Sequence, residues 1–253
     1  MGRLKAEGAA YPTALLLCCA LGGGMVPATV AMAQDPVIPD VTYPSLPKQA
    51  SSAEGFVPSG WVLEAQASGD LNRDSVPDLA LVLRQNNPKN IVKNPGLGEN
   101  PFDTNPRILA VAFRNGPAGD FVLQLENHTL ISRRTDPVMA DPFEEGLTID
   151  RGSLRVNLTL WLSAGGWDMS GMTHTLQYRN GRFELIGYDR STTNRRSLDT
   201  TDVSVNYLTG KMKISTGNSN SDKPAKVTWK TLPRRAPLAI EEIGDGLEFE
   251  PKP

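Results

Sequence analysis

The chain is organised around the stretch Asp70-Leu-Asn-Arg-Asp-Ser-Val-Pro-Asp78, which is followed directly by Leu79-Ala-Leu-Val-Leu83. Side chains that carry oxygen stand at positions 1, 3, 5 and 9 of the nine-residue segment, namely Asp70, Asn72, Asp74 and Asp78. This spacing lets a curled backbone direct all four at one hard cation, as Ca²⁺-binding loops do. The apolar run after the loop predicts a buried strand. The segment therefore predicts a calcium loop that leads into the core.

The same residues allow a simpler interpretation. Asp and Asn favour turns by themselves, because their side chains bond to nearby backbone amides. The segment could then be a polar turn without a metal. Three carboxylates crowded into one loop repel one another unless a cation is present, and this repulsion favours the metal site.

Strand patterns continue on both sides of the loop. Trp61–Ser68 alternates before it, and Arg107–Phe113 and Phe121–Asn127 follow, joined by Asn115-Gly116, a strong hairpin signal. Further strands are expected at 147–149, 154–161, 173–178, 182–188, 202–208, 211–215 and 226–229. No segment has a convincing amphipathic helical pattern. The predicted fold is all-β, an antiparallel meander that forms a sandwich or curled sheet with one propeller-blade-like unit.

The 253 residues divide into four segments. Residues 1–33 have the pattern of a secretory signal peptide: Arg3 and Lys5, an apolar core at 14–21, and a cleavage site after Ala33. Residues 34–60 form a Pro-rich linker, residues 61–231 the all-β domain, and residues 232–253 a loose acidic tail. The predicted location is secreted or periplasmic.

Composition narrows the possible functions. Both cysteines, Cys18 and Cys19, lie in the predicted signal peptide, so the mature chain has no thiol for catalysis, disulfides or zinc. Removal of Arg3, Lys5 and Glu7 reduces 26 basic and 28 acidic residues to 24 and 27. A balance of −3 argues against a dedicated nucleic-acid binder, and no apolar run long enough for a membrane span remains.

The segment from Gly69 to Leu83 resembles an FG-GAP/VCBS-type repeat, whose signature runs Gly-Asp-x-Asn-x-Asp-Gly-x-x-Asp before an apolar strand. The likeness covers a single copy, about residues 61–130; residues 146–229 resemble only secreted bacterial proteins without an assigned function. The resemblance implies a structural Ca²⁺ held by the four oxygen-bearing side chains and by the carbonyl of Val76. It also implies recognition rather than catalysis.

One position departs from the family signature. The glycine that follows the third ligand is Ser75 in this chain. If the backbone there needs φ > 0, a residue other than glycine costs on the order of 1 kcal/mol. The expected site is therefore one of weak, extracellular-grade affinity.

Other candidate residues have two interpretations each. Trp161 and Trp167 flank a glycine-rich turn and form either a ligand-binding surface for a sugar or peptide, or a cap on the sheet core. His128 and His174, the only histidines, are expected to be solvated or hydrogen-bonded residues on separate strands. The carboxylate pairs Asp168 with Glu184, or Asp189 with Asp199, could serve a glycosidase.

The sequence contains no Gly-x-Ser-x-Gly elbow, phosphate loop or His-Glu-x-x-His motif. It therefore predicts a non-enzymatic binding or structural protein with an unknown protein or glycan partner. Two alternatives stay open. One is a divergent carbohydrate-active enzyme that uses carboxylates near the Trp167 loop, and the other is an envelope component with neither ligand nor activity.

Overall fold

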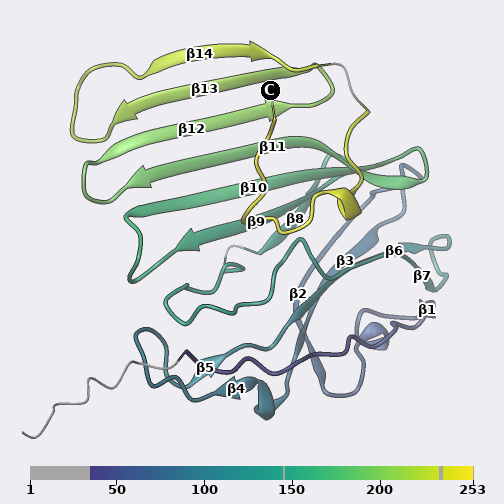
Figure 1. The fold of residues 1–253 in the computed structure, drawn as a ribbon. Coiled ribbons are helices and arrows are strands. Elements are labelled where there is room, and N and C mark those ends of the chain that lie inside the picture. The colour runs from purple at the N-terminus through teal and green to yellow at the C-terminus, as the bar shows by residue number, and fades with distance from the viewer. Residues whose placement is uncertain (1–34, 145, 234–235, 253) are drawn as a thin grey trace, which may run out of the picture. The chain divides into compact units, whose positions relative to one another are not determined.

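A computed structural model describes residues 35–144, 146–233 and 236–252. The predicted signal peptide lies outside these described residues. Every strand pairing is antiparallel, which confirms the all-β class (Figure 1). Within the described residues, no helix has the length and apolar character that a membrane crossing requires.

The first sheet has the order β1-β7-β6-β3-β2. Its strands are β1 (Gln49–Ala50), β2 (Trp61–Gly69), β3 (Asp78–Gln85), β6 (Arg107–Arg114) and β7 (Phe121–Asn127). A two-stranded ribbon and two 3₁₀ turns belong to the same half of the chain: β4 (Ile91–Val92), β5 (Phe102–Asp103), η1 (Glu54–Phe56) and η2 (Pro88–Asn90).

The second sheet has the order β14-β13-β12-β11-β10-β9-β8, a meander in which each strand pairs with the next along the chain. Its strands are β8 (Leu147–Asp150), β9 (Ser153–Trp161), β10 (Asp168–Arg179), β11 (Arg182–Asn194), β12 (Asp199–Asn206), β13 (Lys211–Asn218) and β14 (Lys226–Thr231). The 3₁₀ turn η3 (Ile240–Glu242) follows. The polar residues 189–193, which follow the strand expected at 182–188, extend β11 because they pair with β10 on one side and β12 on the other.

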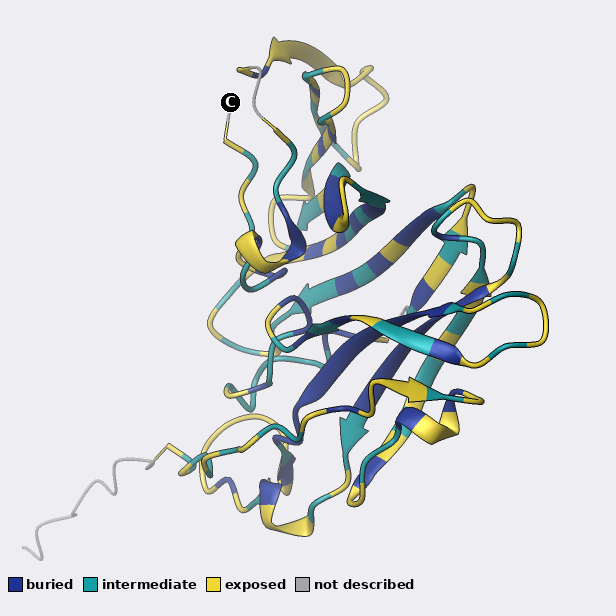
Figure 2. Cartoon of the chain, turned by 90° about the vertical axis from the view of Figure 1, so that its right-hand side faces the viewer, coloured by how far each residue is buried: buried dark blue, intermediate teal, exposed yellow. Residues whose placement is uncertain are grey.

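The apolar run of β3 is buried on both faces of the first sheet (Figure 2). Ala80 and Val82 belong to the main core, which this sheet shares with the second sheet. Leu81 and Leu83 face a smaller core on the opposite side. A strand that is apolar at successive positions needs cover on both faces, since alternate side chains point in opposite directions.

Segments outside the predicted domain cover the second face of β3 and the inner face of the second sheet. In the segment expected to be a linker, Leu46 and Phe56 are buried against β3 and its neighbours. The tail, expected to be loose, packs on the second sheet instead: Ile240 and Leu247 belong to the main core, and Leu238 O accepts a bond from Leu185 N at 2.8 Å. Apolar residues spaced among prolines and acids were enough to anchor both segments, although neither has strand periodicity.

Candidate functional site

The acidic segment forms the loop between β2 and β3. Gly69 and Asp78 are the last paired residues of the two strands, so the loop closes this hairpin. Gly69 lies against the hairpin of β8 and β9: a Cβ atom built there would come within 2.6 Å of the Ile149 side chain. A hollow of about 420 Å³ separates the loop from that hairpin and is lined by Gly69, Asp70, Arg73, Ile149, Arg151 and Gly152. The loop therefore lies at the seam between the two sheets.

The side chains of the loop curl its backbone. Asp70 accepts hydrogen bonds from Arg73 N at 2.6 Å and from Ser75 N at 2.9 Å. Asn72 Oδ1 accepts from Asp74 N at 3.0 Å, and Asp74 Oδ1 accepts from Val76 N at 2.8 Å. Each acceptor oxygen has a second lone pair, so these bonds fix the loop without using up its capacity to bind a cation.

Two residues of the loop adopt the left-handed conformation. The φ angle is 69° at Arg73 and 67° at Ser75. This region is unfavourable for residues other than glycine by roughly 1–2 kcal/mol. The position at which a glycine was expected therefore does need φ > 0, and Ser75 adopts that conformation under strain.

Asp78 anchors the base of the loop. Its side chain is fully buried, and its carboxylate accepts from Leu71 N at 2.8 Å and from Arg114 N at 3.0 Å. Burial raises the pKa of Asp78, and the charge of nearby Asp74 acts in the same direction. Asp78 thus joins the loop to β6 while it holds a carboxylate beside the other acids.

The donor set consists of oxygen atoms, the ligands that Ca²⁺ prefers. In the described part of the chain, none of the ion pairs involves Asp70, Asp74 or Asp78. Among the same residues, no group of three or more Asp, Glu, His or Cys side chains converges as a finished metal site. The chemistry of the donors therefore fits calcium, while binding would require the carboxylates to turn toward a common point.

Trp161 is the last residue of β9, and Trp167 directly precedes β10. Neither belongs to a core cluster. The guanidinium of Arg195 stacks 5.3 Å from the Trp161 ring centroid and donates to Leu162 O at 2.7 Å and Gly166 O at 2.8 Å. Trp167 is 57% exposed. Arg195 therefore holds the glycine-rich turn in place, and the turn presents one tryptophan to solvent.

The carboxylate pairs considered for glycoside hydrolysis are far apart. Asp168 pairs with Asn194 at one end of β10, whereas Glu184 pairs with Gln177, nine residues along that strand. At about 3.3 Å per residue the separation is roughly 30 Å, against the roughly 5–10 Å of glycosidases. Asp189 pairs with Ser204, which lies five residues from Asp199 along β12. The carboxylates of Asp189 and Asp199 are therefore roughly 17 Å apart.

The two histidines lie in different environments. The His128 ring stacks on Tyr43 with a centroid distance of 4.1 Å, and its Nε2 contacts Glu126 at 3.0 Å. The expectation of a solvated or hydrogen-bonded side chain is wrong for His174, which is fully buried and has no hydrogen-bond partner for either ring nitrogen among the described residues. Burial lowers the pKa of His174 to about 4, so this residue is neutral at pH 7.

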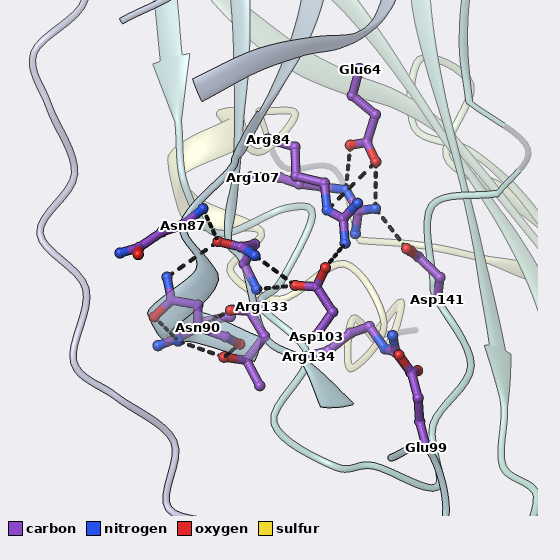
Figure 3. A network of polar contacts seen from close by, with 12 residues as sticks. Glu64, Arg84, Asn87, Asn90, Glu99, Asp103, Arg107, Arg133, Arg134 and Asp141 are labelled. Carbon is purple, nitrogen blue, oxygen red and sulfur yellow. Dashed lines mark hydrogen bonds and ion pairs between the residues drawn. The ribbon is translucent and has the colours of Figure 1, made fainter. Parts of the chain in front are cut away.

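A charged network at the other end of β3 was not predicted (Figure 3). The Arg107 side chain is 4% exposed; it donates twice to Glu64, at 2.6 and 2.7 Å, and once to Asp141 at 2.7 Å. Arg84 pairs with Asp103 at 2.6 Å, and Arg134 pairs with Glu99 at 2.6 Å. The signal in the sequence was an arginine at the boundary of each apolar run, at positions 84 and 107. The acidic partners come from distant segments, so sequence spacing could not identify them.

Comparison of the chain with protein-family models, with curated proteins and with solved structures finds no match. The inferences about function therefore rest on the geometry described above.

Proposed function

We propose that this chain is an exported, non-enzymatic β protein that binds a protein or glycan partner and is stabilised by Ca²⁺ at the loop of residues 70–78. The observation that supports the metal most directly is electrostatic. Three aspartates lie in one short loop, and within the described residues none of them forms an ion pair. By contrast, the acids near the other end of β3, which are Glu64, Glu99, Asp103 and Asp141, each pair with an arginine. A divalent cation would remove this repulsion.

The proposed ligands are Asp70, Asn72, Asp74, Asp78 and the carbonyl of Val76. When bound, the cation supplies positive charge at the seam between the two sheets. The chain's own residues fix the curled backbone through amide bonds to the carboxylates, and Asp78 ties the loop to β6. The expected role of the metal is structural, since the loop closes a hairpin of the first sheet and lies against one of the second.

Calcium binding is tested by thermal unfolding with Ca²⁺ and with a chelator. A ligand that binds only the folded state stabilises it by RT ln(1 + [L]/Kd). With a Kd on the order of 10⁻⁴ to 10⁻³ M, about 10 mM Ca²⁺ is a roughly ten- to hundredfold excess and should stabilise the fold by about 1.4–2.7 kcal/mol. Millimolar Ca²⁺ should therefore raise the melting temperature of the wild type, and Asp74→Ala should remove most of that rise.

The matched control for Asp74→Ala is Asp222→Ala, because Asp222 is an exposed acid in another Asn-rich loop. This variant should keep the full response to Ca²⁺. If the folded wild type has the same melting curve with and without chelator, the segment 70–78 is a polar turn that does not bind Ca²⁺.

The proposed recognition surface for the partner is the turn with Trp161 and Trp167. A rigid aromatic ring that is half exposed offers a flat apolar area for a sugar or peptide. Affinity capture from a cell-envelope extract, with and without Ca²⁺, should recover a partner with the wild type and lose it with Trp167→Ala. Turnover of a glycan substrate that disappears in Asp168→Asn would support the enzyme alternative instead.

Export is tested separately. Mass spectrometry of protein recovered from outside the cytoplasm should show Gln34 as the first residue. A chain that keeps Met1 would contradict cleavage after Ala33.

A further inference from the structure

Strand β14 is an edge strand of the second sheet. Among the described residues it pairs with β13 on one side and with no strand on the other. All six of its residues are exposed (Figure 2). Exposed sheet edges are ready templates for another strand, because their outward backbone groups have no partner.

The register shows which backbone groups point outward. Leu232 N donates to Gly210 O at 2.8 Å, just beyond the pair Lys211 with Thr231. In an antiparallel ladder hydrogen-bonded pairs alternate with pairs that are not bonded. The amides and carbonyls of Val227, Trp229 and Thr231 therefore point away from β13, toward the free edge.

The side chains of β14 differ between its two faces. Val227 and Trp229 lie opposite Ser215 and Lys213, on the outer face of the sheet. They are 47% and 64% exposed, an unusual exposure for two apolar residues on one face. On the inner face, Lys230 lies opposite the buried Met212, and Lys226 shares this face because it is four residues away.

The edge is also basic. Residues 211–230 contain five lysines, at 211, 213, 223, 226 and 230, and one acid, Asp222, in a chain whose net charge is −2. Within the described residues, none of these lysines forms an ion pair. Pairing β14 with a second copy of itself would bring four lysines onto one face of two adjacent strands. An acidic partner strand removes this repulsion.

We infer that β14 is a docking edge for an extended acidic peptide, which adds to the sheet as an eighth strand. Apolar residues of the peptide lie against Val227 and Trp229, and acidic residues at alternate positions lie against Lys226 and Lys230. The peptide backbone bonds to the outward groups of residues 227, 229 and 231. This inference rests on the proposed binding function and names a class of partner, but it places the contact away from Trp167.

The probe is a fluorescent peptide with the core Glu-Val-Glu-Val-Glu-Val between flexible Gly-Ser ends. Its binding to the purified protein is measured by anisotropy at low ionic strength. Two control peptides have the core Glu-Glu-Glu-Val-Val-Val, which keeps the charge and loses the alternation, and Lys-Val-Lys-Val-Lys-Val, which keeps the alternation and reverses the charge. The alternating acidic peptide should bind, and both controls should bind much more weakly.

Val227→Pro tests strand addition directly. Proline removes an amide that points outward and leaves the ladder with β13 intact, a position at which sheets tolerate proline. It should abolish peptide binding while the melting temperature stays close to that of the wild type.

Charge reversal provides a second test that does not depend on proline. Lys226→Glu with Lys230→Glu changes two attractive cross-strand pairs to repulsive ones, so affinity for the acidic peptide should fall about three- to tenfold for each lysine. The same variant should gain affinity for the Lys-Val peptide. The matched control is Lys89→Glu with Lys93→Glu, two exposed lysines in a different loop region, which should leave binding unchanged.

Several results would overturn the inference. Equal binding of the blocked and alternating acidic peptides would show non-specific attraction, and binding that survives Val227→Pro in a folded protein would exclude strand addition. A wild-type dimer that Val227→Pro abolishes would assign the edge to a second copy. Absence of peptide binding up to millimolar concentration would mean that the lysines serve to keep the edge unpaired. Partner capture through Trp167 that persists in Val227→Pro would leave the proposed function intact.

Discussion

The two ends of β3 handle charge in opposite ways. At its beginning, Asp78 and the acids of the preceding loop bond to backbone amides, and no cationic side chain pairs with them among the described residues. At its end, the buried cation of Arg107, on the neighbouring strand, is surrounded by Glu64 and Asp141. The chain itself neutralises the charges at the Arg107 end, whereas the loop end keeps a surplus of negative charge.

The difference indicates where the protein depends on its surroundings. A buried ion pair is sensitive to the loss of either member, because the remaining charge is left without a partner in a low dielectric. An acidic loop bonded to amides folds without a cation but gains from one. The arginine end should therefore respond most strongly to mutation, whereas the loop end should also respond to calcium.

The largest effect is expected for Arg107→Ala. This change leaves Glu64 and Asp141 without their cation and removes a buried side chain, so the free energy of unfolding should fall by about 3–4 kcal/mol. Urea denaturation of both proteins measures the difference.

Arg155→Ala is the control for Arg107→Ala. Arg155 is half exposed, and its ion pair with Asp150 is long, at 3.9 Å. It should change stability by less than about 0.5 kcal/mol. If the two variants are equally stable, the network at the end of β3 contributes little and the comparison fails at that end.

The second effect concerns the base of the loop. Asp78→Ala leaves the amides of Leu71 and Arg114 without an acceptor, so it should destabilise the protein by about 2–3 kcal/mol even in chelator. Asp74→Ala, at an exposed position, should lose under about 1 kcal/mol in the same buffer. Equal losses would show that Asp78 has no special anchoring role.

A smaller effect is expected from relief of strain at Ser75. Because Ser75 has a φ of 67°, Ser75→Gly should stabilise the protein by about 0.5–1 kcal/mol. Ser59→Gly is the control: this exposed residue is not among those with positive φ, so glycine there should destabilise slightly. A destabilised Ser75→Gly protein would contradict the assignment of strain to this position.

The smallest effect is expected for pH. The contributions of Asp78 and Asp141 to stability should change with pH in opposite directions. Burial raises the pKa of Asp78 above its ordinary value of 3.8, so its contribution to stability decreases as the pH rises above that value. For Asp141, burial would raise the pKa, but the hydrogen bond from Arg107 and its charge outweigh burial and lower it below 3.8. Stability from Asp141 is therefore present at neutral pH and is lost in strong acid.

The test of this sign compares the free energy of unfolding of Asp78→Asn and Asp141→Asn with that of the wild type between about pH 2.5 and 7 in chelator. The difference from the wild type should change with pH in opposite directions for the two variants. Parallel profiles would mean that the two ends of β3 have the same electrostatic character.

Local patterns were sufficient for much of the fold. Alternating and continuous apolar runs located the long strands, and the Asn-Gly dipeptide at 115–116 marked the hairpin of β6 and β7, because strand periodicity and turn conformation depend on neighbouring residues. The resemblance to the repeat signature, which has glycine where this chain has Ser75, pointed to the position at which the structure has a positive φ. Cover for the second face of β3, and for the inner face of the second sheet, came from segments without periodicity, so the linker and the tail looked unstructured.

The all-β class, the order of the hairpins and the position of an acidic loop before a buried strand follow from the amino-acid sequence alone. Which charges meet depends on how the strands pair and the sheets pack. The packing placed Arg107 between acids 43 residues before it and 34 residues after it, set Asp168 and Glu184 near opposite ends of the paired strands β10 and β11, and left β14 at an open edge. The reason is that side-chain partners across a sheet are fixed by strand order and register, which depend on burial of the whole core and not on spacing along the chain.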